Sequence, residues 1–348
     1  MSDGTMQDKR VTTGEYKKVA ELVREWIPLH IGERFGLEQI YRDLQVVQRQ
    51  NRQYIAQELR RLVLQGDLIE KLHSTSPHPS PYRVINKDVK TIDWINAEEA
   101  ETIPVVWPYG RADDSHFGFD GHVCIHPGDV IVVAGRSNVG KTTVLQNFLW
   151  DNMDRFRCFV MANEYVPSKF KSRTARMTWA NPLNDDGTAK FGLIDRRDGW
   201  ADVIEPDSIN IIDWMNVTDN FYQIGAIIEG IQAKLSKGIV MIAIQKNAGA
   251  ELGRGGSFSE DLSSLYLSLD FNRLTVRKAK DWYDHNPNHE MYGFEIVNGG
   301  TQFHNIRKVV ACRVCRGSGQ IWCKGSGQEK CGGCAGVGYI DARESEDG

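Results

Sequence analysis

The stretch that decides the fold reads Asp129-Val-Ile-Val-Val-Ala134-Gly135-Arg-Ser-Asn-Val-Gly140-Lys141-Thr142-Thr143. Its first part is apolar and β-branched, which predicts a buried strand. The pattern G-x-x-x-x-G-K-T follows directly, and apolar residues then continue at helical spacing. The pattern alone can occur by chance, but a strand before it and a helix after it favour a loop that binds phosphate groups at a helix N-terminus.

The residue types in this loop each have an expected role. Its glycines let backbone N–H groups point at phosphates, Lys141 reaches the outer phosphates, and Thr142 binds Mg²⁺. We therefore expect ATP and Mg²⁺ as cofactors. The expected nucleotide-binding residues are Gly135, Arg136, Ser137, Asn138, Val139, Gly140, Lys141, Thr142 and Thr143.

Composition limits the class of protein. The chain has 348 residues, of which 25% are charged and 41% hydrophobic, as in soluble globular proteins of two or three domains. No apolar run is long enough to span a membrane, and residues 1–10 lack the apolar core of a signal peptide. We expect a cytoplasmic protein without a membrane partner. The formal net charge of −4 gives no global attraction to nucleic acid, so any DNA contact must come from a local patch.

The character of the sequence changes near residues 90 and 305, which predicts three unequal parts, with a linker between the first two. Residues 14–87 form a first domain, and residues 88–104 form an acidic linker. Residues 105–305 form the core domain that contains the phosphate-binding loop, and residues 306–340 form a small cysteine-rich module.

The first domain is predicted to contain three helices and a β-hairpin. Apolar residues recur at helical spacing over 15–26, 37–44 and 51–65, and two short apolar segments, 68–72 and 82–85, flank a polar loop. This order resembles the winged helix-turn-helix family, which implies a third helix in the major groove and a wing on the DNA backbone. The candidate DNA contacts are Arg52, Gln53, Gln57, Arg60 and Arg61, with Lys71 and His73 on the wing. The alternative is a protein-interaction or oligomerisation module.

Further strands are predicted after the phosphate-binding loop, at 157–162, 208–213, 238–245, 266–269 and 274–280, with a helix over about 220–235 and a turn at 270–273. Alternating strands and helices predict an α/β fold with a mostly parallel, doubly wound sheet. Polar residues stand at three strand ends: Glu164, Asp213 and Gln245. A hydrophobic strand that runs to an aspartate favours Asp213 as a second Mg²⁺ ligand.

This order of motifs resembles the RecA-like ATPases, the core shared by RecA recombinases, hexameric replicative helicases and their small phage-type relatives. The resemblance implies catalysis by Lys141 with four further residues. Glu164 would polarise the attacking water, Gln245 would sense the γ-phosphate, and Lys278 and Lys280 would act across a subunit interface in a homo-oligomeric ring or filament. Three alternatives remain: Glu164 as a solvated strand-end carboxylate, Asp213 as a turn residue, and the two lysines as an ordinary charged edge.

A glycine-rich loop over residues 246–259 follows the predicted fourth strand. In RecA-like proteins, this loop faces the central DNA, so the resemblance implies phosphate contacts from Lys246 and Arg254. The alternative is a surface loop without a ligand. A contact of this kind reads charge rather than base sequence.

Four cysteines form two copies of C-x-x-C-x-G-x-G. Cys312 and Cys315 lie in the first copy, and Cys331 and Cys334 in the second. Two such knuckles supply the four thiolates of a tetrahedral Zn²⁺ site, and Cys323 is not expected to be a ligand. The alternative is a redox dithiol. The repeat resembles the zinc-binding region of J-domain co-chaperones, with two of their four repeats and therefore one metal. No J domain is present, and we infer no chaperone activity.

These features together predict a DNA-associated, Mg²⁺- and ATP-dependent motor or filament protein, helicase-like or recombinase-like. It would act with replication or recombination proteins, in a phage or mobile element. Two other classes fit the same motifs. One is an ATP-switched DNA-binding regulator, and the other is a loader or scaffold whose assembly depends on nucleotide.

Overall fold

The computed structural model describes residues 4–72, 81–89, 91–96, 99, 101–163, 165–215, 223–247, 249–323 and 327–342, with side chains from residue 14 onward. The chain divides into two compact units, Met1–Ala97 and Glu98–Gly348. Among the described residues, no helix has the length and apolar character needed to cross a bilayer.

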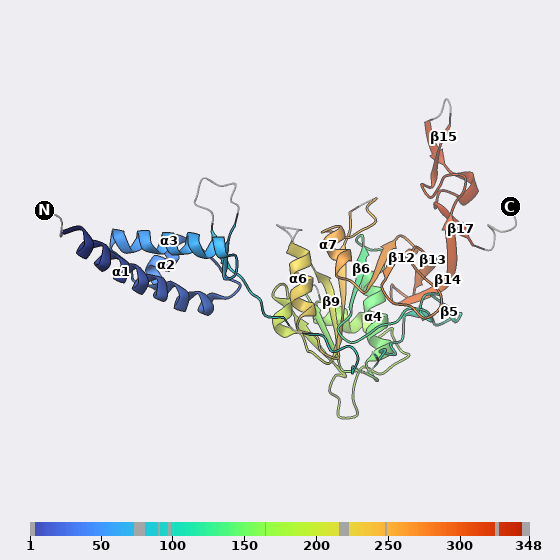
Figure 1. Cartoon of the computed structure of the whole chain (residues 1–348). Helices are drawn as coiled ribbons and strands as arrows, with labels where there is room; N and C mark the ends of the chain where they lie inside the picture. Colours follow the sequence, from blue (N-terminus) through green and yellow to red (C-terminus); the bar gives the residue numbers. More distant parts are fainter. Residues whose placement is uncertain are drawn as a thin grey trace. The chain divides into compact units, whose positions relative to one another are not determined.

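The first unit contains three helices and a small antiparallel sheet (Figure 1). Its elements are α1 (Gly4–Trp26), η1 (Ile27–His30), β1 (Arg34–Phe35), α2 (Leu37–Asp43), α3 (Arg49–Gln65), β2 (Ile69–Lys71) and β3 (Tyr82–Val84). The three predicted helices and the hairpin are confirmed. The sheet order is β1-β3-β2, and the two-residue strand β1 was not predicted because it is too short to show a period. His73 lies outside the described residues.

A buried carboxylate joins α1 to α3. The Glu58 side chain is fully buried, and it accepts hydrogen bonds from Tyr16 Oη at 2.8 Å, from Arg24 at 3.1 Å and from Arg61 at 2.6 Å. Burial alone would raise the pKa of Glu58, but the bonds from Arg61, Tyr16 and Arg24 outweigh burial and lower it. The cluster therefore stabilises the ionised side chain.

Replacing Glu58 with alanine should loosen the first unit. We expect the free energy of unfolding of this unit to fall by about 2–3 kcal/mol. This is less than the ~3–5 kcal/mol lost when one partner of a fully buried ion pair is removed, because both arginines are half exposed. Since the folded pKa lies below the unfolded value, this stabilisation is present at neutral pH and is lost as the pH falls through the folded pKa. Hydrogen exchange of α1 and α3 in the full chain measures the effect. Glu21→Ala, an exposed change on α1, is the control, and equal exchange in both variants would contradict the prediction.

The second unit is built on a twelve-stranded mixed sheet within the described residues. Six neighbouring strands are parallel: β8 (Phe191–Asp195), β7 (Cys158–Ala162), β9 (Ile209–Met215), β10 (Ile239–Gln245), β6 (Val130–Gly135) and β11 (Leu265–Asp270), in that spatial order. The sheet continues antiparallel through β12 (Arg273–Ala279), β13 (Met291–Val297) and β14 (Gln302–Ala311). Beyond β14 lie β4 (Tyr109–Gly110) and β5 (Ser115–His116), and β17 (Tyr339–Asp341) also pairs with β14.

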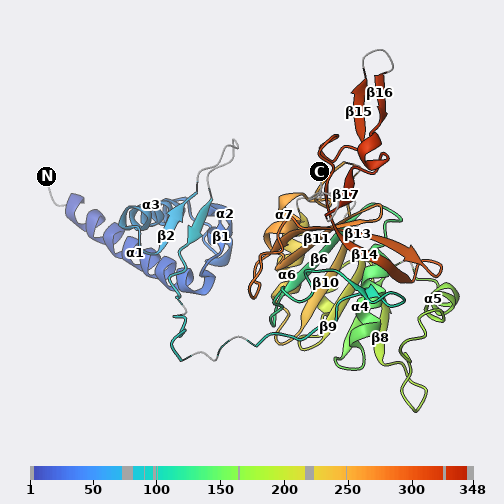
Figure 2. The same ribbon diagram turned by 90° about the vertical axis from the view of Figure 1, so that its right-hand side faces the viewer.

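Helices cover both faces of the parallel strands (Figure 2). Ile131 and Val133 of β6 belong to the hydrophobic core under α4 (Lys141–Asn152). Val130 and Val132 belong to the core under α6 (Gln223–Gln232) on the opposite face. Both faces being buried explains why β6 is continuously apolar. The predicted α/β fold with a mostly parallel sheet is confirmed.

The antiparallel half of the sheet differs from the sequence-based expectation. Strands β13 and β14 were not predicted, and the predicted boundary at residue 305 falls inside β14. The aromatic side chains of Tyr292, Phe294 and Phe303 pack into the same core as α4, which extends the core domain through this region. The cysteine-rich module begins only after β14 ends.

Candidate functional site

The Gly135–Thr143 loop connects the end of β6 to the start of α4. Gly140 has φ +104°, a backbone conformation that favours glycine, and a Cβ there would lie 2.5 Å from Ile296 Cδ1, so a larger residue would also have to displace that methyl group. Lys141 Nζ donates to the carbonyl oxygens of Gly135 at 2.9 Å and of Arg136 at 2.7 Å. The N–H groups in the first turn of an α-helix have no acceptors within the helix, and here that turn lines a cavity. The arrangement favours the binding of an anion at the N-terminus of α4.

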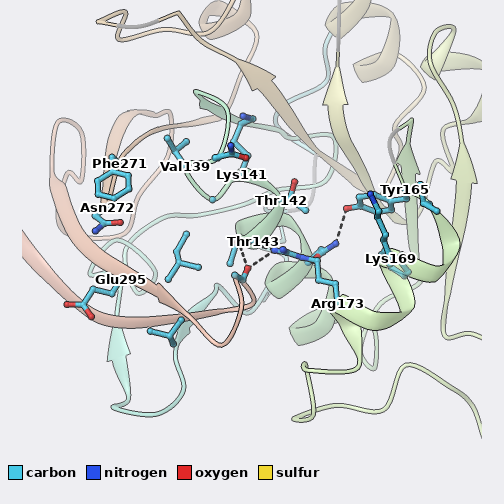
Figure 3. Close-up of a pocket in the computed structure, with 18 residues that line it drawn as sticks. Val139, Lys141, Thr142, Thr143, Tyr165, Lys169, Arg173, Phe271, Asn272 and Glu295 are labelled. Atoms are coloured by element: carbon cyan, nitrogen blue, oxygen red, sulfur yellow. Dashed lines mark hydrogen bonds between the residues drawn. The ribbon is translucent and has the colours of Figure 1, made fainter.

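That cavity, the main cavity below, has a volume of about 670 Å³. Figure 3 shows Phe271, Asn272 and Glu295 on one side of Lys141 and Thr142, and Tyr165, Lys169 and Arg173 on the other. One side therefore contains an exposed aromatic ring, and the other contains two cations and a phenol. A phosphate chain at the loop would have space on both sides.

Asp213, on β9, contacts the first turn of α4. Thr142 Oγ1 donates to Asp213 Oδ1 at 3.3 Å, and Tyr165 Oη donates a short hydrogen bond to Asp213 Oδ2. Burial raises the pKa of Asp213, and burial and this carboxylate raise the pKa of Tyr165. The structure thus brings together the two side chains that the sequence predicted as Mg²⁺ ligands. A carboxylate and a hydroxyl are oxygen ligands of the kind that Mg²⁺ prefers.

The backbone next to Asp213 is irregular. The pairing of β9 with β10 shifts between Ile242 and Ile244, so that the β9 residues Asp213 and Trp214 form a bulge. Trp214 has φ +77°, a strained value for a residue with a large side chain. Such strain persists only when the surrounding structure imposes it, and it gathers at functional sites.

Three residues at this site were missed by the sequence interpretation: Tyr165, Gln146 and Arg173. Arg173, on α5 (Pro167–Thr174), donates to Gln146 Oε1 at 2.6 Å and to the Gly300 carbonyl oxygen at 2.6 Å. Gln146 in turn donates to Tyr165 Oη at 3.1 Å. A hydrogen-bonded network thus joins Arg173 to Asp213 through Gln146 and Tyr165. Burial lowers the pKa of Arg173. No local pattern marks Arg173, whereas Tyr165 follows the strand-end residues directly.

Gln245 lies beside the loop, because it pairs with Gly135 where β10 and β6 run parallel. Its neighbour Lys246 donates its backbone N–H to the Gly135 carbonyl oxygen at 3.1 Å. A change in the backbone position of Gly135 would therefore displace Gln245 and Lys246 at the end of β10. Glu164 lies outside the described residues, between Asn163 and Tyr165.

Lys278 and Lys280 lie away from the loop of their own chain. Lys278 pairs with Tyr266 near the start of β11, whereas Gly135 pairs with Leu269 near the end of that strand. Lys278 Nζ donates to the carbonyl oxygens of Glu260 at 2.6 Å and Asp261 at 2.9 Å, at the end of α7 (Ser257–Asp261). Lys280 is exposed. Any contact with a nucleotide would have to be made in a second chain.

The prediction of Lys246 as a DNA phosphate contact is corrected by the structure. Its side chain is only 1% exposed, and Lys246 Nζ lies 2.8 Å from Asp270 Oδ1 and 2.9 Å from Ser268 Oγ. The ion pair with Asp270 places this cation inside the unit rather than on a surface. Arg254 is half-buried, and its backbone N–H donates to the Gln245 carbonyl oxygen at 2.8 Å.

The five candidate DNA contacts on α3 divide into two groups. Arg52 donates to the Val46 carbonyl oxygen at 3.1 Å, and Arg61 binds Glu58, so both hold the unit together. Gln53, Gln57 and Arg60 are exposed and recur at helical spacing, which places them on one face of α3. Lys71 is exposed at the end of β2.

Four cysteines form a buried cluster after β14. The sulfur atoms of Cys312, Cys315, Cys331 and Cys334 all lie within 4.8 Å of one another. The Sγ atoms of Cys312 and Cys331 are 3.9 Å apart, and those of Cys315 and Cys334 are 3.6 Å apart. Zn–S bonds of about 2.3 Å in a tetrahedron place the sulfurs about 3.8 Å apart, so the cluster fits one Zn²⁺. Cys323 is not in the cluster, as predicted.

The two knuckles are built alike and face each other. The N–H of Gly319 donates to Cys315 Sγ at 3.2 Å, and that of Gly338 donates to Cys334 Sγ at 3.1 Å. A Cβ on Gly319 would lie 2.4 Å from the Gly336 carbonyl oxygen, and one on Gly338 would lie 2.4 Å from that of Gly317. The close approach of the two loops thus explains the repeated G-x-G. Between the knuckles, β15 (Gln320–Cys323) and β16 (Gly327–Lys330) form a hairpin that extends away from the sheet (Figures 1 and 2).

A scan against protein-family models found no match to this chain, and a search of curated proteins found none either.

Proposed function

We propose that this protein is a RecA-like, Mg²⁺-dependent ATPase that acts on DNA as an oligomeric motor or filament. The observation that carries the proposal is the contact of Thr142 with Asp213 beneath the Gly135–Thr143 loop. A glycine loop, a helix N-terminus, a lysine and this oxygen pair form the set of groups that phosphoryl transfer from a nucleoside triphosphate requires. The winged-helix interpretation of the first unit and the exposed face of α3 support the DNA part.

The proposed mechanism assigns a role to each residue at the loop. Lys141 leaves the Gly135 and Arg136 carbonyl oxygens and binds the outer phosphates. Mg²⁺ held by Thr142 and Asp213 would neutralise charge on the phosphate oxygens. Tyr165 orients Asp213 through its hydrogen bond, and Glu164, one residue earlier in the chain, orients the attacking water.

The oligomeric part of the proposal rests on Lys278 and Lys280. Lys278 pairs with Tyr266 near the start of β11, whereas the loop of the same chain begins beside Leu269 near the end of β11. In a ring or filament they would complete the site of the neighbouring chain. Gln245 would transmit the state of the loop to residues 246–256, since it both pairs with Gly135 and accepts the Arg254 N–H. A site completed in trans should make hydrolysis depend on protein concentration.

The test is the ATPase rate of the full chain with single-stranded and duplex DNA, over a range of protein concentrations. We expect hydrolysis to require Mg²⁺ and to rise with single-stranded DNA and with protein concentration. Glu164→Gln should lower the rate by about 100-fold or more, the range seen when a proton-transfer group is lost. A slow rate of hydrolysis that is the same with and without DNA would instead support the ATP-switched regulator or the scaffold. Full activity of Glu164→Gln would remove Glu164 from the mechanism.

A further inference from the structure

The turn between β11 and β12 separates two cavities. Phe271, Asn272 and Glu295 line the main cavity at the loop, and the same three residues line a second cavity of about 250 Å³. On its other side the second cavity is lined by Val337, Tyr339 and Ile340, which belong to the second knuckle and to β17. The Phe271–Asn272 turn and Glu295 thus form a wall that the main cavity shares with the second cavity, which lies next to the cysteine-rich module.

Tyr339 makes the direct contact with this wall. Its Oη donates to the Asn272 carbonyl oxygen at 3.0 Å, and the same oxygen accepts the Phe294 N–H at 3.0 Å. The Arg273 guanidinium lies 5.6 Å from the centre of the Tyr339 ring. Asn272 has φ +54°, so these contacts hold a turn whose backbone is in the left-handed region.

Tyr339 is in turn fixed by the cysteine cluster. The preceding residue, Gly338, donates its N–H to Cys334 Sγ at 3.1 Å and accepts the Cys312 N–H at 3.0 Å. Tyr339 then enters β17, which pairs with Ala311 of β14. The path from the sulfur cluster to the main cavity is therefore continuous: Cys334, Gly338, Tyr339, Asn272.

We propose that Tyr339 is a positioning residue that couples the zinc module to nucleotide binding. With Zn²⁺ held by the four cysteines, Gly338 and Tyr339 are fixed, and the Phe271–Asn272 turn is held against the main cavity. Loss of Zn²⁺ frees that turn and weakens the nucleotide complex. Because coupling between two binding sites is reciprocal, nucleotide must tighten Zn²⁺ binding by the same factor. This inference rests on the proposed nucleotide site.

The experiment measures the dissociation constant of a fluorescent ATP analogue with the full chain. Tyr339→Phe removes only the hydroxyl, so we expect Zn²⁺ content to stay at wild-type level and nucleotide affinity to fall about 3- to 10-fold, the range for one lost hydrogen bond. Tyr283→Phe is the matched control, because Tyr283 Oη bonds to Thr102 Oγ1 at 3.2 Å in a part of the unit that does not line the main cavity. An unchanged affinity in Tyr339→Phe would overturn the inference.

A second measurement tests the reciprocal effect on the wild-type chain. A chromogenic chelator competes for Zn²⁺ with and without saturating ATP analogue, and we expect nucleotide to tighten Zn²⁺ binding several-fold. In Tyr339→Phe this tightening should shrink, which a merely structural tyrosine would not cause. Equal Zn²⁺ affinity with and without nucleotide would overturn the coupling alone. Absence of nucleotide binding in the wild-type chain would overturn both the proposed function and this inference.

Discussion

Replacing Lys141 with alanine is expected to reduce ATP hydrolysis by about 100- to 1,000-fold, the cost of removing one preorganised group that stabilises transition-state charge. In the structure, Lys141 Nζ lies against two carbonyl oxygens of its own loop, within reach of any phosphate bound there. The side chain makes no contribution to the hydrophobic core, so the fold should survive the change. Steady-state phosphate release at saturating Mg²⁺ and ATP measures the effect.

The matched control is Lys237→Ala. Lys237 is exposed and precedes β10, at the opposite end of the sheet from the loop. This variant should keep the wild-type rate and thermal stability. If Lys141→Ala retained more than about a tenth of the wild-type rate, the Gly135–Thr143 loop would not be the catalytic site.

The second large effect is expected at the cysteine cluster. Structural Zn²⁺ sites of four ligands bind with an apparent free energy of about 10–16 kcal/mol near pH 7, and that energy stabilises the folded module. Cys331→Ser removes one fully buried ligand. We expect the purified variant to lose its Zn²⁺ on dialysis against a mild chelator, and the amides of β15, β16 and β17 to exchange rapidly.

Cys323→Ser is the control for this change, since Cys323 lies in the same module but outside the cluster. It should retain one Zn²⁺ per chain by atomic absorption and wild-type amide protection. A wild-type chain that carries no Zn²⁺ when prepared without chelator, or a Cys331→Ser variant with full Zn²⁺ content, would contradict the assignment of the four cysteines.

Local patterns were enough to predict several parts of this molecule. The strand before Gly135, the helix after Lys141 and the two cysteine knuckles each depend on neighbours within a few residues, so composition and spacing reveal them. The contact of Thr142 with Asp213 also followed, because the carboxyl ends of parallel strands meet at one edge of a sheet.

Long-range pairing explains what the sequence did not reveal. Lys246 stands in a glycine-rich loop and was expected at the surface, but Asp270, at the end of another strand, binds it inside the unit. Arg173 reaches the site through its hydrogen bonds to Gln146 on α4 and to the Gly300 carbonyl oxygen, and both partners are distant in the chain. Strand β14 was missed because its inward residues contact a core assembled from segments far away in the sequence.

The pairing of Ala311 with Tyr339 has a consequence for how this protein could arise. The chain leaves β14 and returns in β17 at directly opposite positions, so residues 312–338 form a cassette whose two ends already meet. A gene could gain or lose such a cassette without altering a single strand of the sheet, because a two-residue turn closes an antiparallel pair equally well. The four-cysteine module could therefore be inherited or lost independently of the sheet that carries the Gly135–Thr143 loop, even though Tyr339 contacts the turn at Asn272.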